Sequence, residues 1–352
     1  MAGIVKTRGT LYFLRDMDNL TGEKSIYVKI GIVNKDRTTG SRMKDHQTGN
    51  PRAIVSEHIL EDVPFIRFLE KYLHYFYNDR RISGEWFVMD NDFLEKDVLK
   101  EAKRIRKEQL KFENDIYLAE KLSTQISNGK SRKATKVELK LRDDYNQLML
   151  DKEIANANVS ITRSALLQAI GKVGFVDGVY HLTKAKDSIT FDSTKFKNNN
   201  KILYDAYCFE KEGGFHNKFI VLGGEKLKKA DEPLYNKVKD LPKEAYKETM
   251  ISKVKKRSTK IETLHWNWMK AMRESKLLEW EEIKLDAQLK VAIGHYNQID
   301  EVCTWERKPK DPTLAFNKDL LKQDHPQEYL NYLTVKIGAV NPKLEPTRAY
   351  PF

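Results

Sequence analysis

Five side chains in the first quarter of the chain have types that suit phosphodiester cleavage. They are Tyr12, Lys29, Arg42, His46 and Glu70. A phenol or an imidazole can activate water, and a guanidinium can stabilise charge on phosphoryl oxygens. A carboxylate with a few waters can bind Mg²⁺. These types are separated along the sequence, so the fold must bring them together.

The surrounding residues predict a compact α/β unit that could do so. The expected order is β-β-α-β-α-β, with strands at 9–15, 25–33, 53–60 and 84–88, a short helix holding Arg42 and His46, and a helix at 62–76. A hairpin of the first two strands would set Tyr12 beside residues 29–31 if the register allows. Arg42 and His46 are four residues apart and share one helix face, as do Glu70 and His74.

The order of these motifs resembles the GIY-YIG nuclease superfamily, in its divergent phage and bacterial branch whose second motif reads K-I-G. The resemblance covers roughly residues 9–90. It rests on Gly9-Thr10-Leu11-Tyr12, Val28-Lys29-Ile30-Gly31, Arg42, Gln47-Thr48-Gly49-Asn50-Pro51, Glu70 with His74, and Gly84-Glu85-Trp86-Phe87. It implies the fold of that superfamily and the activity of a metal-dependent endonuclease.

The resemblance also implies roles for the five residues. Tyr12 corresponds to the general base or water-orienting group, and Lys29 would lower the pKa of Tyr12 or hold the attacking water. Arg42 would clamp the scissile phosphate, and His46 corresponds to a position that bears histidine or tyrosine in restriction enzymes. Glu70 would be the single protein ligand of Mg²⁺ or Mn²⁺.

The distribution of charge predicts a nucleic-acid partner. The chain has 352 residues and a net charge of +12, yet residues 1–92 hold 14 basic and 13 acidic side chains. The remainder holds 49 basic and 38 acidic side chains and would attract a polyanion. The dense basic run Lys253, Lys255, Lys256 and Arg257 is the candidate phosphate contact. We therefore expect double-stranded DNA as the partner and residues 157–352 as its targeting region.

The rest of the chain predicts an α+β protein in three parts. A nuclease-like unit at 1–92 would be followed by charged helices within 93–156 and by a mixed, mainly helical region at 157–352, which can divide at 230/231. Expected elements include a helix at 160–170 capped by Ser160 or Thr162, and a strand at 202–209. The charged helices are equally consistent with a solvated linker and with a DNA-contacting arm, and an oligomer could form through them. No internal repeat is evident.

Composition excludes several other classes. Two cysteines, Cys208 and Cys303, exclude a disulfide scaffold and fit a reducing cytoplasm, that of a bacterium or a phage-infected cell. The sequence contains no run of 18 apolar residues, so no membrane span is predicted and no membrane partner is expected.

Two other functions remain open beside a DNA endonuclease of a homing, restriction or phage-related kind. One is a DNA-binding regulator that keeps the nuclease fold without its chemistry. The other is a structural or interaction protein that assembles through the charged helices.

Overall fold

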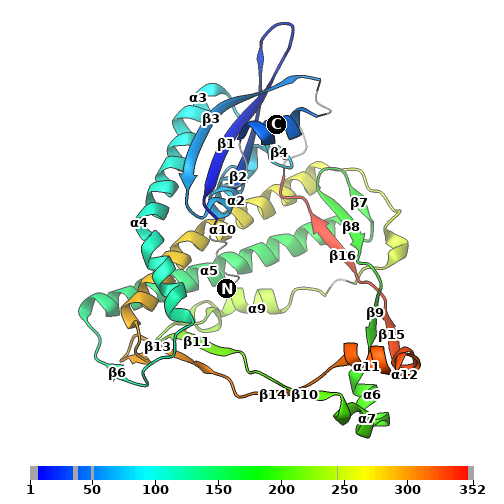
Figure 1. The fold of residues 1–352 in the computed structure, drawn as a ribbon. Helices are drawn as coiled ribbons and strands as arrows, with labels where there is room; N and C mark the ends of the chain where they lie inside the picture. Colours follow the sequence, from blue (N-terminus) through cyan, green and yellow to red (C-terminus); the bar gives the residue numbers. More distant parts are fainter. Residues whose placement is uncertain (1–6, 35–38, 49–50, 244, 348–352) are drawn as a thin grey trace.

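The computed structural model describes residues 7–34, 39–48, 51–243 and 245–347. It is mixed α and β with antiparallel sheets, which confirms the predicted α+β class. Figure 1 shows three layers: a sheet at the top, long helices in the middle, and two β-ribbons below that meet at a cluster of short helices. None of the helices in the described ranges combines the length and apolar character needed to cross a bilayer.

The N-terminal sheet has five strands in the order β3-β1-β2-β5-β4. Their bounds are β1 Gly9–Met17, β2 Lys24–Asn34, β3 Ala53–Val63, β4 Arg81–Ser83 and β5 Trp86–Val88. The strands expected from the sequence are present, and β4 is an addition. In the β1–β2 register, Tyr12 lies opposite Gly31 and Leu14 lies opposite Lys29. Since directly paired residues share a face of a sheet, Tyr12 and Lys29 lie on the same side.

Helices cover both faces of this sheet. The helices are α1 Thr39–Gln47, α2 Ile66–Phe76, a 3₁₀ turn at Asn78–Arg80, α3 Asn91–Phe93 and a π-helical segment at Leu94–Val98. Met43 of α1 packs on the face that carries Tyr12, whereas Leu69 of α2 packs on the opposite face with Phe13. That second core continues to Ile105, beyond the predicted boundary at 92/93.

Three long helices form the middle layer: α4 Leu99–Ser123, α5 Lys136–Ile170 and α10 Thr259–Ile293. The predicted helix start at Ser160 or Thr162 is wrong, because α5 is continuous and the boundary at 156/157 falls inside it. The Ser160 and Thr162 hydroxyls donate to the carbonyls of Asn156 and Asn158, at 3.0 and 2.7 Å. Serine and threonine can satisfy their hydroxyls in this way within a helix, so they need not mark its start.

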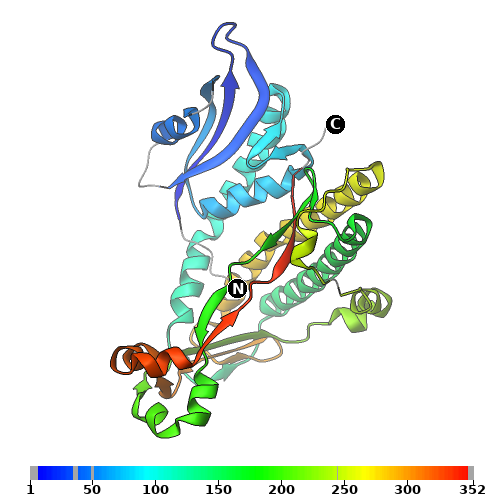
Figure 2. The ribbon, with the colours of Figure 1, turned by 90° about the vertical axis from the view of Figure 1, so that its right-hand side faces the viewer.

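Two β-ribbons extend from this layer, as Figures 1 and 2 show. We define the first arm as β8 Tyr180–Lys184 with β16 Val340–Leu344, continued by β9 Ser188–Phe191 with β15 Leu333–Lys336. The second arm is β11 Phe215–Val221 with β13 Cys303–Pro309, continued by β10 Cys208–Lys211 with β14 Thr313–Phe316. Smaller elements at the bases are β6 Ser131–Arg132, β7 Phe175–Val176, α8 Leu227–Ala230, α9 Glu232–Lys239, a 3₁₀ turn at Glu248–Met250, and β12 Gln298–Ile299.

The two arms meet at a small helical tip, made of α6 Ser193–Asn199, α7 Lys201–Ala206, α11 Lys318–Asp324 and α12 Pro326–Asn331. The predicted strand at 202–209 is wrong, because residues 201–206 are helical and only 208–211 are extended. Tyr204 stacks on Phe316 with ring centroids 4.4 Å apart. This contact between distant segments overrides the strand preference of the apolar residues near Tyr204.

Candidate functional site

A cavity of about 750 Å³ opens beside the N-terminal sheet. It receives side chains from β1, α1, α2, β4 and the turn before β5, and it contains three of the five predicted residues. Its lining residues are Tyr12, Ile32, Val33, Asn34, Arg42, Arg67, Glu70, Lys71, His74, Tyr75, Arg81, Glu85 and Pro346. The other two predicted residues, Lys29 and His46, contact residues of this lining. Stretches far apart in the sequence therefore converge on one space.

Gly31 makes room for the ring of Tyr12. A Cβ at Gly31 would lie 2.6 Å from Cζ of Tyr12, far inside van der Waals contact. Tyr12 is only 1% exposed, so its ring cannot swing away from such a methyl group. The glycine of the K-I-G motif thus allows the tyrosine to lie across the neighbouring strand with its hydroxyl at the cavity.

The Tyr12 hydroxyl has two partners on α1. It lies 3.1 Å from Nε2 of His46, and it hydrogen-bonds the guanidinium of Arg42. Burial lowers the pKa of His46, and the nearby cations Lys29 and Arg42 lower it further. A neutral imidazole can accept the phenol proton while the phenol oxygen accepts from Arg42. The i, i+4 spacing of Arg42 and His46 therefore brings both to one hydroxyl.

Lys29 pairs with Glu85 and not with Tyr12. Its Nζ lies 2.5 Å from Oε2 of Glu85, in the turn between β4 and β5. Burial raises the pKa of Tyr12, and the hydrogen bond that opposes the rise comes from Arg42. Glu85 therefore balances the ammonium of Lys29. The expectation that Lys29 lowers the pKa of Tyr12 or holds the attacking water stays a prediction.

The carboxyl group of Glu70 is partly buried and lies near a second carboxyl group, that of Glu85. Burial first, and the negative charge of Glu85 second, raise the pKa of Glu70 to about 7, against the opposing effects of Lys29, Arg67 and Arg81. Sequence reasoning missed Arg67 and Arg81 as members of the site. Arg67 was detectable, because it precedes Glu70 by three residues and so shares its helix face. Arg81 lies in β4, a strand that no local pattern predicted.

His74 is a structural residue at the edge of the cavity. Its Nε2 lies 3.0 Å from the carbonyl oxygen of Ile30 in β2, and its ring packs against Phe87. A carbonyl can only accept, so the imidazole donates from Nε2. Burial lowers the pKa of His74 to about 4, which keeps the ring neutral. His74 thereby ties α2, which carries Glu70, to the strand that carries Lys29.

The donors present fit one weakly held hard cation. Among the described residues, no group of three or more His, Cys, Asp or Glu side chains could hold a metal by itself. Glu70 and Glu85 nevertheless line the same cavity and repel one another. A divalent ion would relieve that repulsion, and carboxylate oxygen is the ligand that Mg²⁺ and Mn²⁺ prefer. Such an ion would take its other ligands from water and substrate.

The predicted phosphate-binding run at 253–257 is partly used inside the protein. Lys255 donates to the carbonyls of Ala169 and Ile170, at 2.7 and 3.1 Å, at the C-terminal end of α5. Arg257 lies 2.9 Å from Glu262. The structure thus assigns Lys255 and Arg257 structural contacts, because a helix C-terminus and a carboxylate attract cations. Lys253 and Lys256 are exposed.

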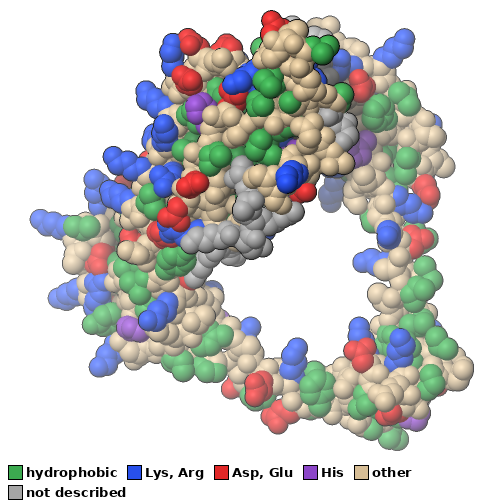
Figure 3. All heavy atoms as spheres, turned by 45° about the horizontal axis from the view of Figure 1, so that its top comes forward, with side chains coloured by type: hydrophobic (Ala, Val, Ile, Leu, Met, Phe, Trp, Pro, Cys, Tyr) green, Lys and Arg blue, Asp and Glu red, His purple; other side chains and the backbone are tan. Residues whose placement is uncertain are grey.

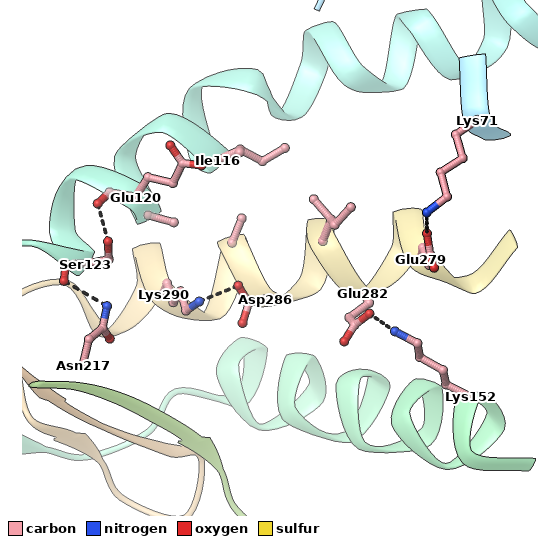
Figure 4. Close-up of a pocket in the computed structure, with 13 residues that line it drawn as sticks. Lys71, Ile116, Glu120, Ser123, Lys152, Asn217, Glu279, Glu282, Asp286 and Lys290 are labelled. Carbon is pink, nitrogen blue, oxygen red and sulfur yellow. Dashed lines mark hydrogen bonds and ion pairs between the residues drawn. The ribbon is translucent and has the colours of Figure 1, made fainter. Parts of the chain in front are cut away.

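A second cavity, of about 460 Å³, lies between α4, α5 and α10 (Figure 4). Six of its seven charged side chains form three pairs. Lys152 contacts Glu282, Lys290 lies 2.7 Å from Asp286, and Lys71 lies 3.6 Å from Glu279. Because these six charges neutralise one another, the three pairs help to hold the helices in place.

Comparison of the chain with protein-family models, with curated proteins and with solved structures finds no match.

Proposed function

We propose that the protein is a metal-dependent endonuclease of the GIY-YIG type that cleaves DNA phosphodiester bonds. One observation carries the proposal: Tyr12, Arg42 and Glu70 come from three distant stretches and line a single cavity. The same cavity adds Arg67 and Arg81, so it offers three guanidinium groups to a bound phosphate. Guanidinium groups stabilise the negative charge that develops on phosphoryl oxygens.

In this proposal Tyr12 and His46 move the proton of the attacking water. The phenol oxygen takes a proton from water as its own proton passes to Nε2 of neutral His46, 3.1 Å away. Tyr12 does not need a low pKa for this relay, because it never carries a full negative charge. Arg42 donates to the phenol oxygen and orients it toward the phosphate.

Glu70 is the residue that would hold the metal, with Glu85 close enough to influence it. When bound, the divalent ion supplies Lewis-acid stabilisation of charge on the phosphate. Lys29 holds Glu85 in place through their ion pair. Ionised Glu70 is required, so the chain should bind the metal better above pH 7 than below it.

The partner in this proposal is double-stranded DNA, held by the basic region that follows residue 92. A near-neutral catalytic unit has little electrostatic affinity of its own for a polyanion, so the excess of basic residues elsewhere supplies it.

Plasmid nicking tests the proposal. Full-length protein with supercoiled plasmid and Mg²⁺ should give nicked circles, and EDTA should stop the reaction. Glu70→Ala should lower the rate at least about 100-fold, whereas Glu61→Ala, which removes an exposed carboxylate on β3, should leave it unchanged. Equal nicking by wild type and Glu70→Ala would point to a contaminant and refute the proposal.

A further inference from the structure

The tip that joins the two arms is an internal repeat. Residues 185–213 and 310–338 each run strand, helix, helix, strand, and every element of the second unit starts and ends 125 residues after its counterpart in the first. Only six positions are identical between the units: Phe191 and Phe316, Lys197 and Lys322, Tyr204 and Tyr329, Tyr207 and Tyr332, Lys211 and Lys336, Gly213 and Gly338. The sequence analysis missed the repeat for that reason.

The contacts between the units are symmetric. The Asp192 amide donates to the Tyr332 carbonyl and the Asn317 amide donates to the Tyr207 carbonyl, both at 2.9 Å. Phe191 stacks on Tyr329 as Phe316 stacks on Tyr204. Each strand pairs with a strand of the other unit. The tip is therefore an interlocked pair that holds the arms together firmly.

The glycines that end the two units are also equivalent. A Cβ at Gly213 would collide with the carbonyl oxygen of Lys310, and a Cβ at Gly338 would collide with that of Ala185. Gly213 lies between β10 and β11 of the second arm, and Gly338 lies between β15 and β16 of the first arm. The chain crosses the tip twice, from the first arm to the second in 185–213 and back in 310–338.

The arms, the tip and the body enclose an opening that passes through the molecule, as Figure 3 shows. Residues 222–243 and 245–254 form the fourth side. They leave the base of the second arm after Val221 and reach the base of the first, where the carbonyl of Lys253 accepts from the amides of Gly174 and Phe175. This seam lies beside a buried cluster that includes Ile170, Val176, Met250, Ile261 and Trp268. The ring cannot open without breaking that core.

The ring carries most of the protein's net positive charge. Residues 180–258 and 303–344, about a third of the chain, hold 25 Lys and Arg against 16 Asp and Glu, which is a net charge of +9 out of +12 for the whole chain. The tip helices, 192–207 and 317–332, hold five of each sign. The excess therefore belongs to the arms and to the segment between their bases, where it would attract a polyanion.

The length of the first arm also suits a nucleic acid. The nine strand residues of β8 and β9 alone give this arm a length of roughly 30 Å. A B-DNA duplex is roughly 20 Å across.

We propose that linear duplex DNA threads through this ring, so that the protein is linked to its substrate topologically as well as electrostatically. The choice of DNA rests on the proposed function. Because opening the seam would break the core beside it, DNA must enter by an end. Electrostatic contacts fail at high salt, but a threaded duplex with blocked ends stays enclosed.

A capping experiment tests the threading. Full-length Glu70→Ala protein, which should not cut, is mixed at low salt with a linear duplex that carries biotin at both ends. Streptavidin is added either after the protein or before it, and the sample is then washed with about 1 M NaCl, where electrostatic screening is nearly complete. We expect at least about tenfold more protein on DNA capped afterwards than on DNA capped beforehand. A covalently closed circle of the same sequence should bind at low salt and release fully in the wash.

Equal release from both capped duplexes, retention on the closed circle, or no binding at low salt would each overturn the threading proposal. Its failure is distinguishable from failure of the nuclease proposal. Wild-type nicking of plasmid does not depend on retention at high salt, and retention of Glu70→Ala protein does not depend on cleavage.

Discussion

The ring of Tyr12 lies across Gly31, its direct partner on the neighbouring strand, so closely that a single added methyl group would strike the phenol. This relationship places the hydroxyl between His46 and Arg42. The glycine of the K-I-G motif is thus required for the packing of Tyr12.

Gly31→Ala should therefore damage the site. The methyl group meets a fully buried ring, so we expect a loss of about 1–3 kcal/mol in the free energy of unfolding and at least a tenfold loss of nicking rate. Gly40→Ala is the matched control, since nothing lies within 4 Å of its Cβ and it sits in helix α1. Chemical denaturation and plasmid nicking measure the two effects. A Gly31→Ala protein as stable and active as Gly40→Ala would contradict the packing described here.

Glu85→Gln should shift the pH dependence of cleavage. Glu85 raises the pKa of Glu70, while the Lys29 cation that it neutralises lowers it. Removing the Glu85 charge ends the repulsion and exposes Glu70 to an unbalanced ammonium, so both changes lower the pKa of Glu70. Because cleavage requires ionised Glu70, the acidic limb of the rate profile should move below pH 7. Nicking rates between pH 5.5 and pH 8.5 would show this, and an unchanged or higher midpoint would count against it.

Glu70→Gln should stabilise the metal-free protein at high pH. The folded-state pKa of Glu70, about 7, lies above its unfolded value, so the folded state favours the protonated carboxyl. The resulting stabilisation is present at low pH and is lost as pH rises through 7. Removing the charge should therefore raise the free energy of unfolding by about 1–2 kcal/mol at pH 8, and by less at pH 5. Urea unfolding in EDTA measures this, and a destabilised variant at pH 8 would be the contrary result.

His74 should make the fold acid-sensitive. Its pKa of about 4 lies below the unfolded value, so the neutral ring contributes stability above pH 6.5 that is lost as pH falls toward 4. Between pH 7.5 and pH 5 the free energy of unfolding of the wild type should fall by about 2 kcal/mol more than that of His74→Gln. Glutamine is the suitable replacement because its amide can also donate to the Ile30 carbonyl. Identical pH dependence of the two proteins in urea unfolding would show that His74 does not titrate as described.

Local patterns predicted much of the sheet and the site. Tyr12 and Lys29 sit on one face because hairpin register fixes which residues pair, and Arg42 and His46 meet at one hydroxyl because a helix repeats every four residues or so. Spacing alone was sufficient to put Arg42 and His46 on one helix face. That this face meets the Tyr12 hydroxyl, and which residue of the second strand pairs with Tyr12, came from the structure.

Long-range relationships could not be predicted in the same way. The ion pair between Lys29 and Glu85 joins residues 56 apart, and no local pattern pointed to Glu85 as the partner of the lysine. The helix at 201–206 depends on an aromatic stack between Tyr204 and Phe316, and Lys255 caps a helix that ends 85 residues earlier. Each of these depends on which surfaces meet after folding, which periodicity does not record.

The central claim is that three distant stretches form one cleaving site. The most direct test compares the Mg²⁺-dependent nicking rates of Tyr12→Phe, Arg42→Ala and Glu70→Ala with those of Tyr27→Phe, Lys44→Ala and Glu61→Ala, which change the same chemistry at exposed positions of the same unit. The account predicts losses of at least about 100-fold for each of the first three and less than about twofold for each control. Wild-type rates in any of the first three, with the protein folded, would contradict it.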